Sequence, residues 1–167
     1  MDADAAKLRQ ELEDAFQSRG HLYRLMLDEL ERELGKPGGE AAMIRVLEKR
    51  GREAGSALFA GLPADPVKIG ERFLSVSPDG GRMYPHERET SEGRIAIRVR
   101  RCPLKDAWMG AGLPPARVAQ LCRIAGAFDR GLFEAAGVAF ENTTWSEARG
   151  GGCCWIELTR RLARDGD

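Results

Sequence analysis

The sequence predicts an α+β fold in which N-terminal helices pack with a small antiparallel sheet and a central helical segment. Apolar residues recur at helical spacing over residues 3–34 and again over 40–59. Later in the chain, alternating segments at 94–101 and 153–159 predict strands on either side of a helical stretch. The length of 167 residues and the hydrophobic content of 43 % fit one domain with a substantial core. We therefore expect a single domain, 1–167.

Helices dominate the predicted N-terminal part, residues 1–60. Gly20 is a candidate break in the first apolar run, and Gly35 is a clearer stop because Pro37-Gly38-Gly39 follow it. A second run, from about Glu40 to Phe59, predicts another helix. The bulk of this part is expected to pack as helices. Homodimerisation through one apolar stripe is the alternative role.

The α+β part, residues 67–160, follows a linker-like turn at 62–66 and is expected to carry the functional site. Another turn at 78–81 precedes a strand at 84–90 and its partner at 94–101. The next predicted elements are a short helix at 104–109, a longer helix at 115–129 and a further helical turn at 132–136. Two strands at 138–145 and 153–159 follow, and a charged, frayed tail covers 160–167. Gly131 is expected to end the longer helix.

Composition excludes several functional classes. Lys plus Arg and Asp plus Glu both number 26, so the chain lacks the basic excess typical of nucleic-acid binders. No apolar run approaches the roughly 20 residues that span a membrane, and the acidic start lacks a secretory signal. We therefore expect a cytoplasmic protein with reduced thiols. Without a CxxC spacing, no structural zinc is expected, and no cofactor either.

Cys102 is the first candidate catalytic residue because a predicted strand meets a predicted helix there. With Pro103 at the first helical position, Cys102 becomes the N-cap, where free N–H groups and the helix dipole stabilise a thiolate. Strand alternation also predicts that Arg98 and Arg100 share a face with Cys102, where they would bind a substrate carboxylate. A structural thiol beside solvated arginines is the alternative.

Cys122 and Asp129 lie on nearly the same face of the longer predicted helix, because seven residues separate them. An acid on an apolar face needs a partner or a chemical role. The alternatives are a small core thiol and a solvated carboxylate near the helix end.

Cys153 and Cys154 follow three glycines and open the last predicted strand. Strand alternation predicts that their side chains point to opposite faces, with Cys154 toward the core. Cys154 is a catalytic candidate and Cys153 a substrate-binding candidate. His86, across the hairpin from Cys102, is a further candidate partner for that thiol.

Taken together, scattered residues of the second half resemble the 2-amino-thiazoline-4-carboxylate hydrolase-like family over about 70–160. The matching residues are Arg101-Cys102-Pro103-Leu104, Trp108, Gly112, Leu121-Cys122, Asp129, Gly137 and Gly152-Cys153-Cys154. The family is distantly similar to vinyl-reductase-type small-molecule-binding domains and to TRAPP vesicle-tethering subunits. The resemblance implies helices packed on a small antiparallel sheet, often in a dimer.

The activity that the resemblance implies is hydrolytic opening of a cyclic amidine ring, which releases a carbamoylated cysteine. Cys102, Cys122, Asp129 and Cys154 match recurring positions and are the implied catalytic residues, while Trp108 joins the substrate-binding set. The doubled cysteine leaves open whether Cys153 or Cys154 is the match. Gly150–Gly152 also stand where the family pattern has an acidic residue.

Three functional hypotheses follow. In the first, the protein is a hydrolase that uses a Cys102 thiolate, or water activated by Asp129, on a small carboxylated substrate. In the second, the same residues form a binding or sensor module for a small molecule or a soft metal held by clustered cysteines. In the third, the N-terminal helices serve as a partner-binding surface. We expect a small-molecule ligand, and neither a nucleic acid nor a membrane.

Overall fold

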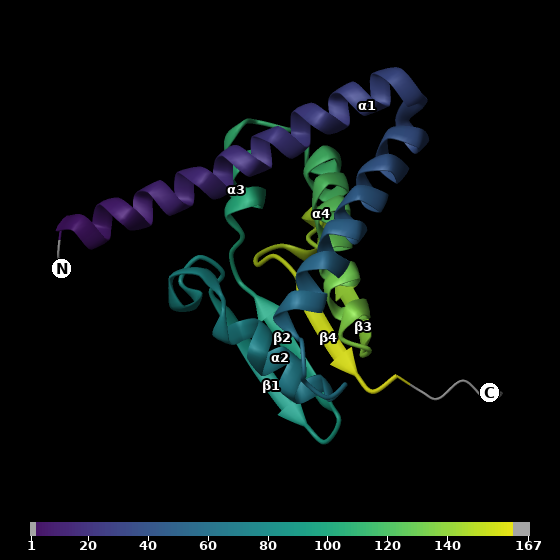
Figure 1. The fold of residues 1–167 in the computed structure, drawn as a ribbon. Helices are drawn as coiled ribbons and strands as arrows, with labels where there is room; N and C mark the ends of the chain where they lie inside the picture. Colours follow the sequence, from purple (N-terminus) through teal and green to yellow (C-terminus); the bar gives the residue numbers. More distant parts are fainter. Residues whose placement is uncertain (1–2, 162–167) are drawn as a thin grey trace.

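The first helix is sharply bent, and it packs against two helices that follow later in the chain. In the computed structural model, which describes residues 3–161, α1 runs from Ala3 to Leu58 with a sharp bend at Gly35. Figure 1 shows its N-terminal half as a long rod and its second half returning beside α4 (Pro115–Ala135). The predicted α+β class is confirmed. The prediction for the tail at 162–167 lies outside the described residues.

The bend occurs at the predicted stop and not at Gly20. Gly35 has φ 74° and ψ 160°, which L side chains rarely adopt, and Pro37 follows it inside the helix. Gly20 stays helical and buried because a Cβ there would come within 3.3 Å of the Leu104 Cα. Its carbonyl accepts a 2.7 Å hydrogen bond from Nε1 of Trp108. The expected helix break at Gly20 is therefore wrong, and this glycine serves close packing.

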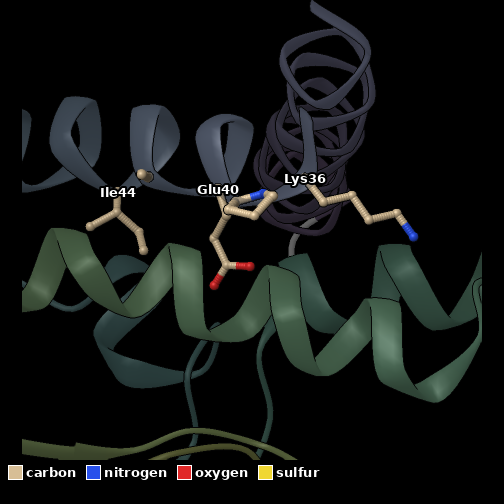
Figure 2. A pocket seen from close by; sticks show the side chains of 5 residues that line it. Lys36, Glu40 and Ile44 are labelled. Carbon is tan, nitrogen blue, oxygen red and sulfur yellow. The ribbon is translucent and has the colours of Figure 1, made fainter. Parts of the chain in front are cut away.

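The two arms of α1 are tied to α4 by polar contacts near the bend. A shallow hollow there is lined by Lys36, Pro37, Glu40, Ala41 and Ile44. Figure 2 shows Glu40 and Ile44 pointing toward the neighbouring helix and Lys36 pointing away. Glu40 accepts a 2.8 Å hydrogen bond from Gln120, so its carboxylate is already engaged in holding the helices together.

Further along, α1 and α4 touch through their backbones. A Cβ at Gly51 would lie 2.0 Å from the Phe128 carbonyl oxygen, and one at Gly55 would lie 2.2 Å from that of Leu132. From the other side, a Cβ at Gly131 would lie 2.1 Å from the Glu48 oxygen. Gly131 therefore does not end the helix, as expected from the sequence, but allows α1 to approach it.

A four-stranded antiparallel sheet forms the other layer. Its strands are β1 (His86–Ser91), β2 (Arg94–Val99), β3 (Ala139–Thr143) and β4 (Trp155–Thr159), in the order β1-β2-β4-β3. The central pair aligns Ile95 with Leu158 and Ile97 with Ile156, and all four side chains are buried. The four predicted strands are thus present, although each is shorter than expected.

Short helices complete the fold. The sequence did not predict α2 (Pro66–Ser75), which begins at an Asp65 N-cap and packs Gly70 against the side chain of Ile95. The predicted short helix is α3 (Pro103–Gly110), and single 3-10 turns lie at η1 (Pro78–Gly81) and η2 (Glu147–Arg149). No described helix is both long and apolar enough to cross a membrane.

The backbone contact at Gly51 generates the first prediction. We expect Gly51→Ala to lower the free energy of unfolding by about 1–3 kcal/mol, because the added methyl group meets backbone that cannot move aside. Urea denaturation measures this change. Gly110→Ala is the matched control because its site, in α3, has no atom within 4 Å. Equal stability of the Gly51→Ala and wild-type proteins would contradict the packing.

Candidate active site

A cavity of about 600 Å³ lies between the helices and the sheet. Its wall is largely apolar, and its polar side chains are few. The thiols that line it are Cys102, Cys122, Cys153 and Cys154, and the other polar residues are Arg19, Tyr23, Arg50, Ser77, Tyr84, His86 and Asp129. A mostly apolar cavity of this size with a few convergent polar groups is typical of small-molecule sites.

Cys102 is the N-cap of α3, as the sequence predicted. Its backbone is extended, with φ −140° and ψ 121°, and Pro103 occupies the first helical turn. The thiol makes no cap hydrogen bond of its own. It is half-buried and lines the cavity, where the free N–H groups of the first turn of α3 favour its thiolate.

Residues 152–154 are held against the segment that contains Cys102. The Cys153 N–H donates to the Val99 carbonyl at 3.0 Å, and the Val99 N–H donates to the Cys154 carbonyl at 2.8 Å. From the other side, Lys105 Nζ donates to the Gly152 carbonyl at 2.8 Å. These bonds flank Cys102 on both sides along the chain, so the doubled cysteine lies next to it.

Lys105 is the one charged side chain in the buried set of residues 3–161, at 8 % exposed. Besides the Gly152 carbonyl, its ammonium faces the ring of Trp145 at 5.9 Å from the centroid. Burial of this lysine is not predictable from the sequence, because a lysine in a first helical turn is usually solvated.

The thiols perturb one another. The pKa of Cys102 lies below its ordinary value, chiefly because the Cys153 thiol hydrogen-bonds to it, with further help from the N–H groups of Lys105 and Leu104 against the effect of burial. The pKa of Cys153 is raised by its hydrogen bonds to Cys102 and Cys154 and by burial. Cys102 is thus the thiol that ionises first in this pair.

The other two thiols differ in environment. Burial raises the pKa of Cys122, which is 5 % exposed on α4, so it stays a neutral thiol. The Sγ atoms of Cys153 and Cys154 lie 3.3 Å apart. The expectation that their side chains point to opposite faces is therefore wrong, because β4 begins only at Trp155 and the two cysteines precede it.

Asp129 lines the same cavity, about two helical turns along α4 from Cys122 and on nearly the same face. It is half-buried among apolar side chains, and burial raises its pKa to about 7, while the positive charge of Arg19 opposes this effect. Such a carboxyl group can both give and take a proton near neutral pH.

Residues outside the predicted catalytic and substrate-binding sets complete the site, and among them only His86 was a candidate from the sequence. Arg19 lies over the Phe16 ring at 4.7 Å, and Phe16 meets Tyr84 edge-on at 5.6 Å between centroids. The pKa of Tyr84 is raised by burial and then by the negative charge of the Cys102 thiolate. His86 lines the same cavity, with Nδ1 2.9 Å from the Tyr84 carbonyl. No local pattern marks Arg19, because helix arginines are usually solvated.

Two predicted substrate-binding residues lie elsewhere. Arg98 is exposed on the solvent side of β2, and Arg100 pairs with Glu87 of β1 with Nε 3.0 Å from Oε1. The strand ends at Val99, so alternation does not continue to Cys102, and the expected shared face is wrong. Trp108, in contrast, lines the cavity and is 1 % exposed.

Within residues 3–161, no group of three or more His, Cys, Asp or Glu side chains is arranged to hold a metal ion.

Comparison with known proteins identifies a matching family and a solved structure of similar fold. The sequence model of the L-2-amino-thiazoline-4-carboxylic acid hydrolase family matches residues 16–157. Among solved structures, trafficking protein particle complex subunit 3 from Naegleria fowleri, covalently bound to palmitic acid, is similar in fold with a TM-score of 0.53. The two are 16 % identical, and the match covers 90 % of this chain and 98 % of that one. No curated protein matches.

The raised pKa of Asp129 predicts a pH dependence of stability. Because the folded protein holds this proton to about pH 7 while the unfolded chain releases it near 4, stability falls as the pH rises through this window. In the wild-type protein, we expect the free energy of unfolding to fall by about 2 kcal/mol between pH 5 and pH 8 because of Asp129, and this fall should be absent in Asp129→Asn. The figure is smaller than the full linkage value because the side chain keeps some accessible surface. Urea denaturation at both values measures it. A parallel pH dependence in both proteins would contradict the burial of Asp129.

Proposed function

We propose a hydrolytic function on a cyclic amidine for this chain, which belongs to the L-2-amino-thiazoline-4-carboxylic acid hydrolase family. One observation carries the proposal: Cys102, Cys122, Asp129 and Cys154 all line one cavity. Among them, Cys102 has a lowered pKa and Asp129 a raised one. Attack on an amidine carbon requires a thiolate nucleophile, which the lowered pKa of Cys102 favours, and a group such as Asp129 that exchanges a proton near neutral pH.

Substrate binding is assigned to different arginines from those that the sequence indicated. Arg19 lines the cavity, stacks on Phe16, and makes no salt bridge to any described carboxylate. Arg50 lines the same wall. A guanidinium held by a ring and lacking a carboxylate partner is suited to a substrate carboxylate. The apolar wall then accommodates the sulfur-containing ring.

The reaction proceeds in two stages on the protonated amidine. The Cys102 sulfur bonds to the amidine carbon, the ring carbon–nitrogen bond breaks, and the Asp129 carboxyl gives its proton to the departing nitrogen. Water then gives a proton to the Asp129 carboxylate while its oxygen bonds to the same carbon, and the Cys102 thiolate leaves. Loss of the hydroxyl proton completes a carbamoylated cysteine, and one water is consumed. In the alternative route, Asp129 activates water directly without an adduct.

The apolar wall supports a second candidate function, in which the cavity holds an acyl chain without turnover. The structural neighbour carries covalent palmitic acid. Exchange with an acyl thioester would place the chain on Cys102, and the donor thiol would leave with the Cys102 proton. A thioester on the purified protein would be released by hydroxylamine and lost in the Cys102→Ser protein.

Replacing the nucleophile tests the hydrolase directly. With 2-amino-thiazoline-4-carboxylate as substrate, we expect Cys102→Ser to lower kcat at least about 100-fold, because a hydroxyl does not ionise at neutral pH. Ring opening is followed by chromatography of the product, and urea denaturation checks that the variant folds. Cys122→Ser is the control variant, because it removes a cavity thiol that stays protonated and is not the proposed nucleophile. Turnover retained in Cys102→Ser removes the covalent route and leaves activation of water by Asp129.

The assignment of Arg19 generates a separate prediction. We expect Arg19→Gln to raise KM about 10-fold or more with a smaller effect on kcat, because it removes an interaction with the unreacting carboxylate. Arg98→Gln is the matched comparison, since Arg98 is exposed outside the cavity. A rise in KM for Arg98→Gln and none for Arg19→Gln would contradict the placement of the carboxylate.

A further inference from the structure

We propose that Cys102 and Cys153 are a redox pair that closes into a reversible disulfide when a peroxide enters the cavity. This modification depends on the arrangement of the thiols and not on the hydrolytic reaction. Three thiols that line one cavity, Cys102, Cys153 and Cys154, carry the inference.

The backbone brings the two cysteines together from both sides. Val99 exchanges hydrogen bonds with Cys153 and Cys154, and Lys105 holds the Gly152 carbonyl at 2.8 Å. Cys102 lies between these two anchors in the sequence. Both thiols line the same cavity, and the Cys153 thiol is the main cause of the lowered pKa of Cys102, so the two sulfur atoms face each other across a short gap.

The glycines before Cys153 allow the remaining adjustment. Gly150 and Gly152 have φ of 71° and 94°, and a Cβ at Gly150 or Gly151 would meet nothing within 4 Å. The turn therefore has free space around it and a backbone that can change conformation at low cost.

Other pairings are disfavoured. Cys153 and Cys154 have their sulfurs 3.3 Å apart, but adjacent Cα atoms are only about 3.8 Å apart across a trans peptide, below the usual span of about 4.4–6.8 Å for a disulfide. A disulfide between them is therefore strained and easily reduced. Cys122 is 5 % exposed, and its raised pKa keeps it protonated and slow to react.

The chemistry requires a peroxide as oxidant. The Cys102 thiolate attacks one peroxide oxygen, the oxygen–oxygen bond breaks, and a proton converts the leaving oxygen to water or an alcohol, which leaves Cys102 as sulfenic acid. The Cys153 sulfur then bonds to the Cys102 sulfur, and the sulfenic hydroxyl departs as water with the Cys153 proton. Two electrons pass from the thiols to the peroxide. A dithiol reductant such as dithiothreitol returns them and restores both thiols.

If the proposed hydrolysis holds, the disulfide also switches it off, because the nucleophile is consumed. This consequence rests on the proposed function, whereas the disulfide does not. Mapping the cross-link therefore tests the redox pair even in a protein without hydrolytic activity.

The test is oxidation of the purified protein with a slight excess of hydrogen peroxide, followed by alkylation and tryptic mass mapping. Cleavage after Arg101, Lys105, Arg149 and Arg160 places Cys102 on the peptide 102–105 and both later cysteines on 150–160. We expect these peptides joined, with a loss of two hydrogens, and separated again by dithiothreitol. Cys154→Ser is the matched control and keeps the cross-link, whereas Cys153→Ser loses it and accumulates overoxidised Cys102.

Several results would overturn the proposal. A cross-link within 150–160 alone would assign the pair to Cys153 and Cys154 instead. Stable sulfinic acid on Cys102 in the wild-type protein would show that no thiol resolves the sulfenic acid. Four thiols that are unchanged after peroxide would show that the cluster is inert. If Cys153→Ser does not fold, Cys153→Ala is used, and persistence of the cross-link to 102–105 in either variant contradicts the assignment.

Discussion

The backbone contact between α1 and α4 is the constraint on which the rest of the structure depends. At Gly51, Gly55 and Gly131, no side chain separates the two helices, so their axes approach more closely than packed side chains would allow. Next to this contact, Arg50 on α1 and Asp129 on α4 both reach the cavity wall. The bend at Gly35 returns the second arm of α1 to this contact, while the first arm supplies Arg19 and covers α3. This glycine contact between α1 and α4 thus sets the positions of the elements that bound the cavity.

Within that cavity, the reactivity of the thiols follows from the backbone segments that hold them. Cys102 is the N-cap of α3, three residues after the central strand β2 ends, a position where unpaired N–H groups favour an anion. The ties from Val99 and Lys105 bring a second thiol to it, which lowers the pKa of the first and raises its own. The same contact therefore lowers the pKa of Cys102 and places Cys153 where it would form a disulfide with an oxidised Cys102. The proposed hydrolysis and the proposed redox response would both use this arrangement of thiols, whereas Asp129 is assigned a role only in the proposed hydrolysis.

Features that depend on neighbouring residues could be predicted from the sequence, whereas contacts between elements that are distant in the sequence could not. The N-cap position of Cys102 and the apolar face shared by Cys122 and Asp129 depend on a strand–Pro junction and on helical spacing, both readable along the chain. Gly20 and Gly131 looked like helix breaks because glycine has low helix propensity, but close packing against another helix outweighs that preference. Arg98 was assigned by extending strand alternation beyond Val99, where the strand ends. Arg19 reaches the cavity only because α1 folds back over α3, and no pattern within the helix reveals that.

Trapping the intermediate tests the central claim, that Cys102 is the nucleophile of this cavity, most directly. The protein is mixed with 2-amino-thiazoline-4-carboxylate carrying ¹³C at the amidine carbon, quenched in acid during turnover, and digested. The account predicts a labelled adduct on the peptide 102–105 and on no other thiol peptide. A label on the peptide 150–160, or turnover with no adduct on any peptide, would contradict it.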